Sequence, residues 1–416
     1  MPVPSLRRDR DFLRFWAGQT ASQFGGQITQ LTVPLTAVVA LGAGSEQVGL
    51  LRAVQQVPIF LFALFVGVWV DRWRGRGVML LADGGRALAL AVVPLAYAFD
   101  ALGVATLYVA GFFVGIFTIF FDVAYQAYLL RLVDREQLIQ GNSMLESTRS
   151  AAQIGGPSLG GGLVTLLTAP VAVAAGPVLF AVSFLSIWRI RRPESVPSSA
   201  GRREGMVRQI REGLVVVGGD AALRAVALVS GAFNFALAAF MTVYLIFLPR
   251  ELGLSGAAVG LCLAALGPGA LVGSLLSARL PRLLGYGVLL LAASAVSDAM
   301  LLGVAAVHGS GIGTIALLMA INFLFGALAQ TVNVAVTSIR QAITPDAYQG
   351  RVSATVRFAA LGFAPLGSLL GGYLGDAAGL RPAVFLTALA LFLSPLFMSV
   401  SPLARLGRRL PGPAAA

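Results

Sequence analysis

Long hydrophobic segments follow one another along nearly the whole chain, with short polar connections between them. A helix that crosses a lipid bilayer needs about 20 mostly apolar residues. Segments that meet this requirement are 12–40, 47–70, 78–99, 104–130, 142–167, 170–190, 221–249, 256–280, 285–307, 312–340, 350–377 and 380–402. The pattern predicts an all-α integral membrane protein with twelve transmembrane helices in a lipid bilayer.

The composition supports this prediction and excludes two other classes of protein. Hydrophobic residues make up 57% of the 416 residues and charged residues only 12%, whereas soluble domains carry about 25% charged residues. A soluble fold could not cover so many apolar side chains, and a disordered chain would be rich in charge. The 49 glycines suit close packing between helices in a bilayer.

All 30 basic residues are arginines, and the net charge is +12. A basic protein can bind nucleic acid, but these arginines form short clusters between the hydrophobic segments. Cytoplasmic loops of membrane proteins are enriched in such residues. With both termini in the cytoplasm, 23 arginines fall on that side and two, Arg250 and Arg381, on the other. We therefore expect a multi-pass protein of the cell membrane, with cytoplasmic termini and no nucleic-acid partner.

The two halves of the sequence resemble each other at an offset of 208–211 residues. Among the matches are Val48-Gly49-Leu50 with Val259-Gly260-Leu261, Pro58 with Pro268, and Arg72 with Arg282. These matches predict two pseudo-symmetric six-helix bundles, related as parallel repeats. We place the bundles at 1–190 and 221–416, joined by a cytoplasmic linker at 191–220 that is partly helical over 204–216.

The connection after the second predicted helix reads Gly67-Val-Trp-Val-Asp71-Arg72-Trp-Arg74-Gly75-Arg76. It resembles the signature cytoplasmic loop of the major facilitator superfamily, although Arg74 stands where that pattern usually has glycine. The resemblance implies a transporter whose gating loop contains Gly67, Asp71, Arg72 and Arg76. A carboxylate at Asp71 could pair with an arginine or a helix N-terminus in one conformation and release it in the other. A plain basic loop is the alternative.

The fifth predicted helix contains a second motif, Gly156-Pro157-x-x-Gly160-Gly161. It is similar to the motif of the antiporter branches of the superfamily, which are exporters. Proline bends a helix, and glycines leave one face flat for close packing, so this face could seal one side of a pathway. Glycine and proline are also common in membrane helices generally, which is the alternative interpretation.

A third stretch, Phe121-Asp122-Val-Ala-Tyr125-Gln126, completes the resemblance. Together with Asp83 and Arg86, it is similar to the drug:proton antiporter branch, which includes macrolide-efflux and enterobactin-exporter relatives. The similarity covers essentially the whole chain. It implies alternating access between the two bundles, driven by protons.

Several ionisable residues lie inside predicted membrane helices, where they are costly and usually face a partner or a water-filled cavity. Asp83/Arg86 and Glu146/Arg149 are i,i+3 pairs, so the members of each pair share a helix face. With Asp122 they form either a protonatable network that changes partners during transport or a permanent cluster that holds helices together.

Two carboxylates stand apart from these pairs. Asp122 is the strongest candidate for carrying the proton, because no arginine lies within one helical turn of it in the sequence. Asp298 lies near the middle of the ninth predicted helix, with Ser294 and Ser297 close by in sequence. It is either protonated and silent or a site for a proton or a cationic substrate.

Amide side chains mark a possible substrate cavity. Gln19, Gln23, Gln27 and Gln30 form one polar stripe along the first predicted helix, which contact with lipid would disfavour. We expect this stripe to line a central cavity, with interhelical hydrogen bonding as the alternative for each amide. Other helices contribute further candidates: Gln126, Asn234, Asn322, Gln330 and Asn333.

The sequence contains no phosphate-binding loop, so ATP does not drive the protein directly. It has no His/Cys cluster that would hold a metal, and we expect no cofactor and no enzyme activity. These features predict a monomeric secondary transporter that exports a small, moderately hydrophobic molecule, such as a drug, a siderophore or a natural product, in exchange for protons. An importer or facilitator of a small metabolite is one alternative, and a membrane receptor or membrane-embedded enzyme is another.

Overall fold

The computed structural model describes residues 6–134, 137–192, 194 and 206–408. Within these residues every regular element is a helix, and nine helical segments are long and apolar enough to cross a membrane. Five of them are interrupted by a short break and are named as pairs of elements. In chain order the segments are α3 (Gly75–Ala98), α4 (Val104–Leu132), α6–α7 (Ala169–Trp188), α9 (Ala221–Arg250), α10–α11 (Gly256–Leu276), α13–η4 (Tyr286–Ala306), α14 (Ile312–Ile343), α15–α16 (Gln349–Ala377) and α17–α18 (Leu380–Ser399).

Three further helices have the length of a membrane span: α1 (Arg10–Leu35), α2 (Ser45–Arg72) and α5 (Leu138–Leu166). Two of them are rich in polar residues, since α1 carries the glutamine stripe and α5 carries Glu146 and Arg149. Together with the nine apolar segments, they make twelve long helical segments in the described part of the chain. The prediction of an all-α protein with twelve membrane helices is confirmed.

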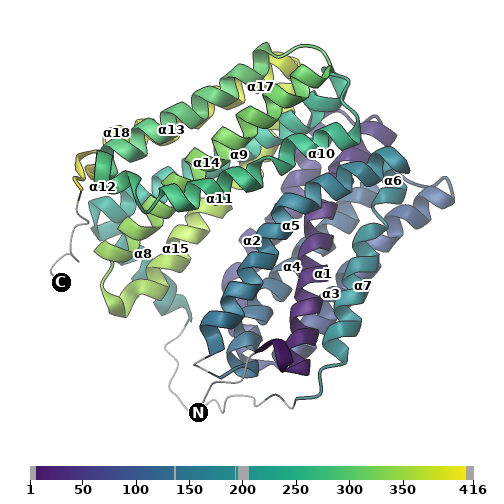
Figure 1. The fold of residues 1–416 in the computed structure, drawn as a ribbon, viewed down its shortest axis with the longest axis horizontal. Helices are drawn as coiled ribbons and strands as arrows, with labels where there is room; N and C mark the ends of the chain where they lie inside the picture. Colours follow the sequence, from purple (N-terminus) through teal and green to yellow (C-terminus); the bar gives the residue numbers. More distant parts are fainter. Residues whose placement is uncertain (1–5, 135–136, 193, 195–205, 409–416) are drawn as a thin grey trace. The chain divides into compact units, whose positions relative to one another are not determined.

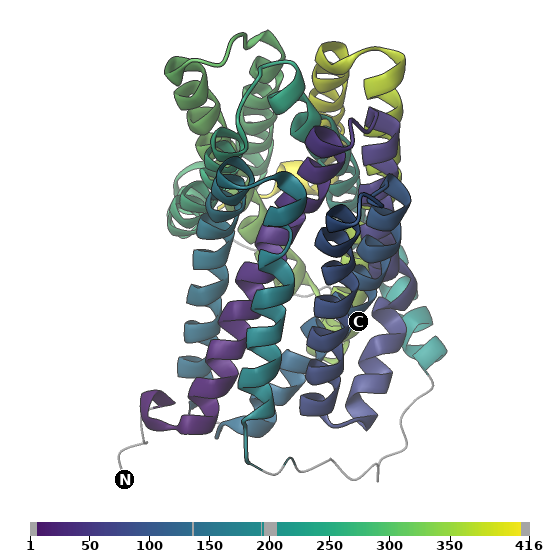
Figure 2. The ribbon, with the colours of Figure 1, turned by 90° about the vertical axis from the view of Figure 1, so that its right-hand side faces the viewer.

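The chain forms two compact units. Unit 1 comprises residues 1–43, 54–201 and 255–261, and unit 2 comprises residues 44–53, 202–254 and 262–416. In Figure 1 the purple-to-teal helices α1, α3, α4, α5 and α7 belong to unit 1, and Figure 2 shows α1 running along that unit from the end near the N-terminus. Two helices change unit along their length, because α2 begins in unit 2 and α10 begins in unit 1.

Each unit has its own core. In unit 1, Phe12, Phe15 and Phe121 pack with Tyr128 and Ile187, and all five are buried. The rings of Phe15 and Tyr128 lie 5.5 Å apart between their centres, a separation typical of favourable aromatic pairs. In unit 2 one core cluster is aliphatic and includes Val226, Leu290, Ile339, Val352 and Met398.

The buried positions repeat between the two units. Seven buried residues of α3 match seven buried residues of the α13–η4 segment when 211 is added to their numbers. The α3 residues are Val78, Met79, Ala82, Asp83, Arg86, Leu90 and Val93, and their counterparts are Leu289, Leu290, Ala293, Ser294, Ser297, Leu301 and Val304. The same offset relates the buried residues Gly176, Phe180, Ser183 and Ile187 of α7 to Thr387, Leu391, Ser394 and Met398 of α17–α18. The two units therefore use one packing register.

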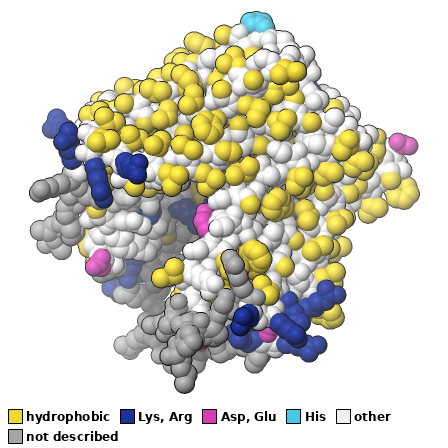
Figure 3. Space-filling model, viewed as in Figure 1, with side chains coloured by type: hydrophobic (Ala, Val, Ile, Leu, Met, Phe, Trp, Pro, Cys, Tyr) yellow, Lys and Arg dark blue, Asp and Glu magenta, His cyan; other side chains and the backbone are white. Residues whose placement is uncertain are grey.

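Large apolar side chains are exposed on the outer faces of the helices. Leu88, Leu166 and Leu275 are 75%, 82% and 76% exposed. Hydrophobic side chains are spread over the upper and right-hand parts of the face in Figure 3, where the arginines gather in a few small clusters. A surface of this kind suits contact with lipid tails rather than water.

A short amphipathic helix precedes α9. It is α8 (Met206–Gly219), and it lies in the segment expected to be partly helical. Glu212 on α8 forms an ion pair of 2.5 Å with Arg351 on α15 (Gln349–Gly362). Of the predicted linker, residue 193 and residues 195–205 lie outside the described part of the chain.

Candidate functional site

A buried ion pair lies where four helices of unit 1 meet. Asp83 and Arg86 on α3 form a salt bridge, and their side chains are 0% and 3% exposed. Ser183 on α7 (Ala175–Trp188) donates a hydrogen bond of 2.6 Å to Oδ2 of Asp83. Nη2 of Arg86 donates one of 3.0 Å to the hydroxyl of Ser22 on α1. The pair predicted on one helix face thus forms a polar site shared by three helices.

The fourth helix contributes an aromatic ring. Cζ of Arg86 lies 4.2 Å from the centre of the Phe121 ring on α4 and 4.4 Å from that of Phe180 on α7. Stacking of this kind stabilises a guanidinium in a desolvated place. The charge of Arg86 is thus compensated within unit 1, and loss of one partner would leave the other charge buried.

The other charged residues of the predicted network lie on α4 and α5. Asp122 is half-buried on α4, one residue after Phe121. Glu146 and Arg149 pair on α5 at 3.8 Å, with side chains 69% and 52% exposed. Exposed pairs of this kind contribute little to stability. The structure therefore brings Asp83 and Arg86 into one buried site and leaves Glu146 and Arg149 as a separate, exposed pair.

Asp298 lies deep inside unit 2, on α13 (Tyr286–Leu302), and is 1% exposed. The hydroxyl of Ser297 lies 3.3 Å from Oδ1 of Asp298 and 2.8 Å from the carbonyl oxygen of Ser294. Oδ2 of Asp298 is buried and has no hydrogen-bond partner in the described part of the chain. This carboxyl group is thus less well satisfied than that of Asp83.

The glutamine stripe of α1 changes in exposure along the helix. Gln19 is 2% exposed, and its Oε1 has no hydrogen-bond partner among the described residues. Gln23 and Gln27 are half-buried, and Gln30 is exposed. Only the later part of the stripe is therefore open to solvent.

Asn322 on α14 is fully buried in unit 2 and joins two helices. It donates hydrogen bonds of 2.8 Å to the hydroxyl of Tyr244 on α9 and 2.9 Å to the carbonyl oxygen of Leu318. This geometry fits the interhelical hydrogen bonding that the sequence left open. The other four amides bond to nearby residues in sequence: Asn234 with Ser230, Gln126 with Tyr125, and Asn333 with Gln330.

The glycines of the motif on α5 pack against α1. A Cβ added to Gly156 would collide with Cβ of Gln27, and one added to Gly160 would lie 3.5 Å from the backbone of Ile28. Gly161 faces the start of α10 (Gly256–Ala264), where a Cβ would collide with the carbonyl oxygen of Gly256. The motif thus allows backbone-to-backbone packing on two sides.

Unit 2 repeats this arrangement. Gly367 and Gly371 on α16 (Ala364–Ala377) pack against backbone carbonyls of α9, and Gly372 packs against Gly49 near the start of α2. Gly367, Gly371 and Gly372 correspond to Gly156, Gly160 and Gly161 when 211 is added to their numbers, and Gly49 corresponds to Gly260 by the same offset.

A hydrogen-bonded helix cap lies beside each of two glycine contacts, that of Gly161 with α10 and that of Gly372 with α2. The hydroxyl of Thr165, on α5, accepts a hydrogen bond of 2.7 Å from the backbone N–H of Ala257 in α10. The carboxylate of Asp376, at the same offset on α16, accepts bonds of 2.9 Å from the N–H groups of both Ser45 and Glu46 in α2. Each cap satisfies backbone donors that a helix N-terminus leaves free.

The predicted gating loop is only partly described. Gly67, Asp71 and Arg72 lie in the last turns of α2, but their side chains are outside the described residues. Arg76 donates hydrogen bonds of 3.3 Å and 2.6 Å to the carbonyl oxygens of Ile187 and Trp188. A cation in this place complements the C-terminus of α7.

Glu194 is a residue of this region that the sequence analysis missed. It accepts hydrogen bonds from the backbone N–H groups of Gly75 (2.8 Å) and Arg76 (3.2 Å) at the start of α3. It also forms an ion pair of 2.5 Å with Arg131 on α4, and its side chain is 4% exposed. An acidic residue within a strongly basic connector was the signal that could have found it.

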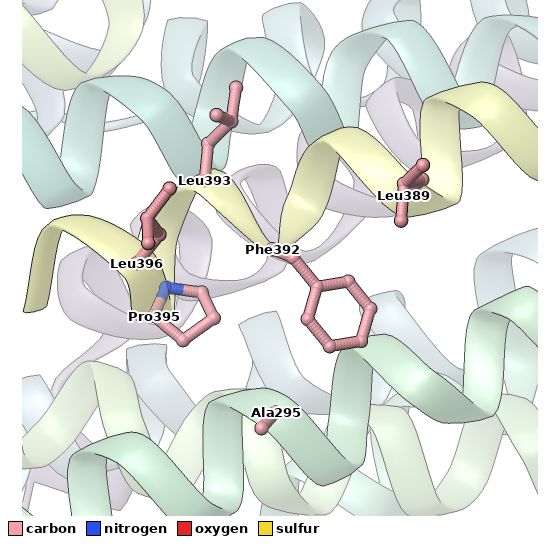
Figure 4. A pocket seen from close by; sticks show the side chains of 6 residues that line it. All are labelled: Ala295, Leu389, Phe392, Leu393, Pro395 and Leu396. Atoms are coloured by element: carbon pink, nitrogen blue, oxygen red, sulfur yellow. The ribbon is translucent and has the colours of Figure 1, made fainter. Parts of the chain in front are cut away.

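An apolar groove opens between α13 and the break from α17 (Leu380–Leu391) to α18 (Leu393–Ser399). Figure 4 shows the side chains that line it, and its volume is about 400 Å³. The lining residues are Ala295, Leu389, Phe392, Leu393, Pro395 and Leu396. Leu389, Leu393 and Leu396 are also exposed, so the groove fits an apolar occupant such as a lipid chain and holds no ionisable group.

A family profile described as a transmembrane secretion effector matches residues 4–409. The chain belongs to this family. Members of the major facilitator superfamily are among its relatives, so the resemblance drawn from the motifs is confirmed. The relatives that match this chain over most of its length are transporters, and this chain is a multi-pass membrane transporter rather than an enzyme.

Three relatives of this transmembrane secretion effector illustrate the similarity. The uncharacterized MFS-type transporter YfiS of Bacillus subtilis is 24% identical over 92% of this chain and 91% of its own. The multidrug efflux pump Tap of Mycolicibacterium fortuitum is 28% identical over 83% of each chain. The enterobactin exporter EntS of Citrobacter koseri is 28% identical over 78% of this chain and 76% of its own.

Solved structures share the fold. A bacterial homologue of the iron transporter ferroportin, in an inward-facing state, matches with a TM-score of 0.76 and 16% identity over 95% of this chain and 98% of its own. A bacterial homologue of the lysosomal transporter Spinster matches with a TM-score of 0.74 and 14% identity over 97% and 98% of the two chains. At these identities the likeness extends to the fold and no further.

Proposed function

We propose that this transporter exports a small, moderately hydrophobic molecule from the cytoplasm in exchange for protons. The observation that carries this proposal is the similarity to Tap and EntS over most of the length of each chain. One is a multidrug efflux pump and the other an enterobactin exporter. A drug, a siderophore or another natural product is accordingly the expected class of substrate.

The proposed mechanism is alternating access of the bundles 1–190 and 221–416, joined by the linker 191–220. The close-packed motif around Gly156, Pro157, Gly160 and Gly161 would seal one side of the pathway. Its packing on α1 and on the start of α10 supports this role. The loop with Gly67, Asp71, Arg72 and Arg76 would act as the gate, and the amides that are not fully buried would contact the substrate.

Asp122 is the proposed proton carrier. It follows Phe121, whose ring covers the buried pair of Asp83 and Arg86. A change in the charge of Asp122 would therefore be felt next to the site that joins four helices. Glu146 and Arg149 would take part as exposed charge partners.

The arginine distribution supports a cell-membrane location with both termini in the cytoplasm, since 23 of the 30 arginines fall on that side. We further propose that the protein works as a monomer with small-molecule substrate, protons and lipid as its partners, and without nucleic acid. Labelling of cysteines introduced at residues 77 and 192 would test the orientation. Labelling of the two sites from opposite faces of the membrane would contradict it.

Export is tested by expression in a bacterial host that lacks its own efflux pumps. We expect increased resistance to, and decreased accumulation of, at least one compound from a panel of drugs and siderophores. In everted vesicles an imposed pH gradient should then drive uptake of that compound. Asp122→Asn should abolish this uptake while the protein remains folded, and undiminished uptake would remove Asp122 from the mechanism.

The alternatives give different results in the same experiments. Downhill uptake into proteoliposomes without a pH gradient would favour an importer or facilitator of a metabolite. Conversion of a candidate lipid by the protein in detergent, without transport, would favour a membrane enzyme.

A further inference from the structure

The surroundings of Asp298 in unit 2 correspond to the buried ion-pair site of unit 1. At the common offset of 211, Asp83 corresponds to Ser294, Arg86 to Ser297 and Ser183 to Ser394. All three serines are buried, at 6%, 1% and 2% exposed. Unit 2 therefore places hydroxyl groups where unit 1 has its acid, its base and its serine, and a carboxyl group one residue beyond.

The groups that hold a fixed cation in unit 1 are absent from the same register of unit 2. The rings of Phe121 and Phe180 lie over Arg86, whereas the corresponding residues are Val332 and Leu391. Aliphatic side chains have no ring face on which a guanidinium could stack. Unit 2 thus has a carboxyl group, at Asp298, and keeps the serine of α7 as Ser394, but it has no counterpart of Arg86 or of the two rings.

No charged neighbour compensates Asp298 in the described part of the chain. The elements packed against α13 are α14, α17, α18 and the short helices α12 (Leu280–Leu284), η4 (Gly303–Ala306) and η6 (Pro402–Arg405). Arg340 of α14 bonds to Ser353, and Arg381 of α17 bonds to the carbonyl oxygens of Ala305 and Val307. Among the described residues, neither these two arginines nor Arg282 or Arg405 forms an ion pair with Asp298, whose one hydrogen-bonding side chain is Ser297.

An isolated carboxylate in the interior of a membrane bundle is several kcal/mol less stable than a neutralised one. In unit 1 an internal arginine supplies the neutralising charge. In unit 2 no side chain supplies this charge among the described residues, so a bound cation carrying one positive charge must neutralise Asp298. A proton is the cation that fits, because the described residues contain no cluster of three or more metal-binding side chains and both carboxyl oxygens are buried against protein.

We propose that Asp298, with Ser294, Ser297 and Ser394 around it, is the place where unit 2 binds an exchangeable proton. The proton converts the carboxylate into a neutral carboxyl group, which can donate a hydrogen bond as well as accept the one from Ser297. Unit 1 carries a permanent cation at the matching position and unit 2 a removable one. The part of this inference that concerns transport rests on the proposed function, but the occupancy of the site does not.

Infrared spectroscopy of the purified protein at neutral pH tests the proposal directly. A protonated carboxyl group gives a C=O stretching band that is separate from those of carboxylates and shifts in D₂O. We expect this band in the wild type, its loss in Asp298→Asn, and its retention in the matched variant Asp83→Asn. A wild type without a D₂O-sensitive band, or a band that persists in Asp298→Asn, would overturn the proposal.

A second variant places the fixed cation of unit 1 into unit 2. Ser294→Arg, one helical turn before Asp298 and so on the same helix face, should neutralise Asp298 permanently and remove the same infrared band, even where overpacking lowers the stability of the protein. Sodium serves as the control cation. Loss of the wild-type band when sodium chloride replaces choline chloride would show a sodium site and would refute the assignment of a proton site.

The transport readout separates this inference from the proposed function. In everted vesicles, Asp298→Asn should abolish ethidium uptake driven by a pH gradient. A wild type that shows the infrared band but no uptake of ethidium or any other panel compound would contradict the proposed function alone. Uptake in Asp298→Asn equal to that of the wild type would contradict the role of the site in coupling.

Discussion

Oε1 of Glu194 lies 2.5 Å from Nη1 of Arg131, and the carboxylate also accepts hydrogen bonds from two backbone N–H groups at the start of α3. One carboxylate thus joins α3 and α4 to the segment that follows α7. The geometry puts a negative charge at a helix N-terminus, where the partial positive charge of the helix favours it. All three interactions use the carboxylate of Glu194. Because this side chain is almost completely buried, water could not replace it as a partner.

Replacement of this side chain should therefore be costly. Glu194→Gln leaves Arg131 without its counter-ion, and we expect the free energy of unfolding to fall by about 1.5–3 kcal/mol, the range of hydrogen bonds to charged groups. The thermal midpoint of the purified protein in detergent measures the loss. Glu46→Gln removes a charge from the first turn of α2 at an exposed position and should lower the midpoint much less. An equal effect of both substitutions would disprove the structural role of Glu194.

Substitution in the buried pair Asp83/Arg86 should lower the stability of the protein more than Glu194→Gln does. Asp83→Asn leaves a guanidinium buried between two rings, and breaking a buried pair in this way costs about 3–5 kcal/mol. The double variant Asp83→Asn/Arg86→Leu should be more stable than the single one, because no uncompensated charge remains. Glu146→Gln breaks an exposed pair and should change stability by less than about 0.5 kcal/mol. The thermal midpoints of the four proteins decide this order.

Two adjacent glycines on α5 provide a matched comparison. A Cβ on Gly161 would collide with the backbone of α10, whereas a Cβ on Gly162 has no neighbour within 4 Å. Gly161→Ala should destabilise the protein by about 1–3 kcal/mol, as overpacking does, and should reduce drug resistance in a pump-deleted host. Gly162→Ala adds no collision and should lower neither quantity. Wild-type resistance of the Gly161→Ala strain would show that this close packing has no function in export.

Asp11 gives a prediction on pH. It lies at the first turn of α1, before the apolar residues begin, and its side chain is 17% exposed. Partial burial acts to raise the pKa of Asp11, but the N–H groups of Arg191 and Arg192 and the guanidinium of Arg14 outweigh it, so the pKa lies below its ordinary value.

Because the pKa of Asp11 is lower in the folded protein than in the unfolded chain, its ionised form stabilises the fold. This contribution is fully present at pH values above the pKa of the unfolded chain, about 3.9. This contribution is lost as the pH falls through the lower value of the folded protein. The thermal midpoint of Asp11→Asn should thus be below that of the wild type at pH 7, and the two should converge at low pH. Asp134→Asn, at an exposed position, serves as the control. A constant difference between Asp11→Asn and the wild type at all pH values would refute the assignment.

The fold could be predicted from the sequence because hydrophobic length alone defines a membrane helix. The segment predicted at 104–130 is α4 at Val104–Leu132, and the pair Asp83/Arg86 was placed on one face because both residues belong to one helix. Contacts between helices were beyond this reasoning. Ser183 and Phe180 reach Arg86 and Asp83 from α7, about 100 residues away along the chain, and no local pattern encodes that approach.

The surroundings of Asp298 could likewise be predicted only in part. Its two neighbouring serines were apparent from sequence, but its relation to the site around Asp83 became visible only from the shared register of buried positions. The motif glycines were found because their spacing is local. Their partners at the start of α10 were not, because those partners come from a distant part of the chain.

The two helices that change unit have a mechanical consequence. The chain passes from unit 2 to unit 1 after residue 53 and from unit 1 to unit 2 after residue 261. Pro58 follows the first crossing and Pro268 the second, and α10 itself ends at Ala264. Proline removes a backbone hydrogen bond and lets a helix flex. Each crossing is therefore followed by a proline, a residue at which the helix lacks one backbone hydrogen bond.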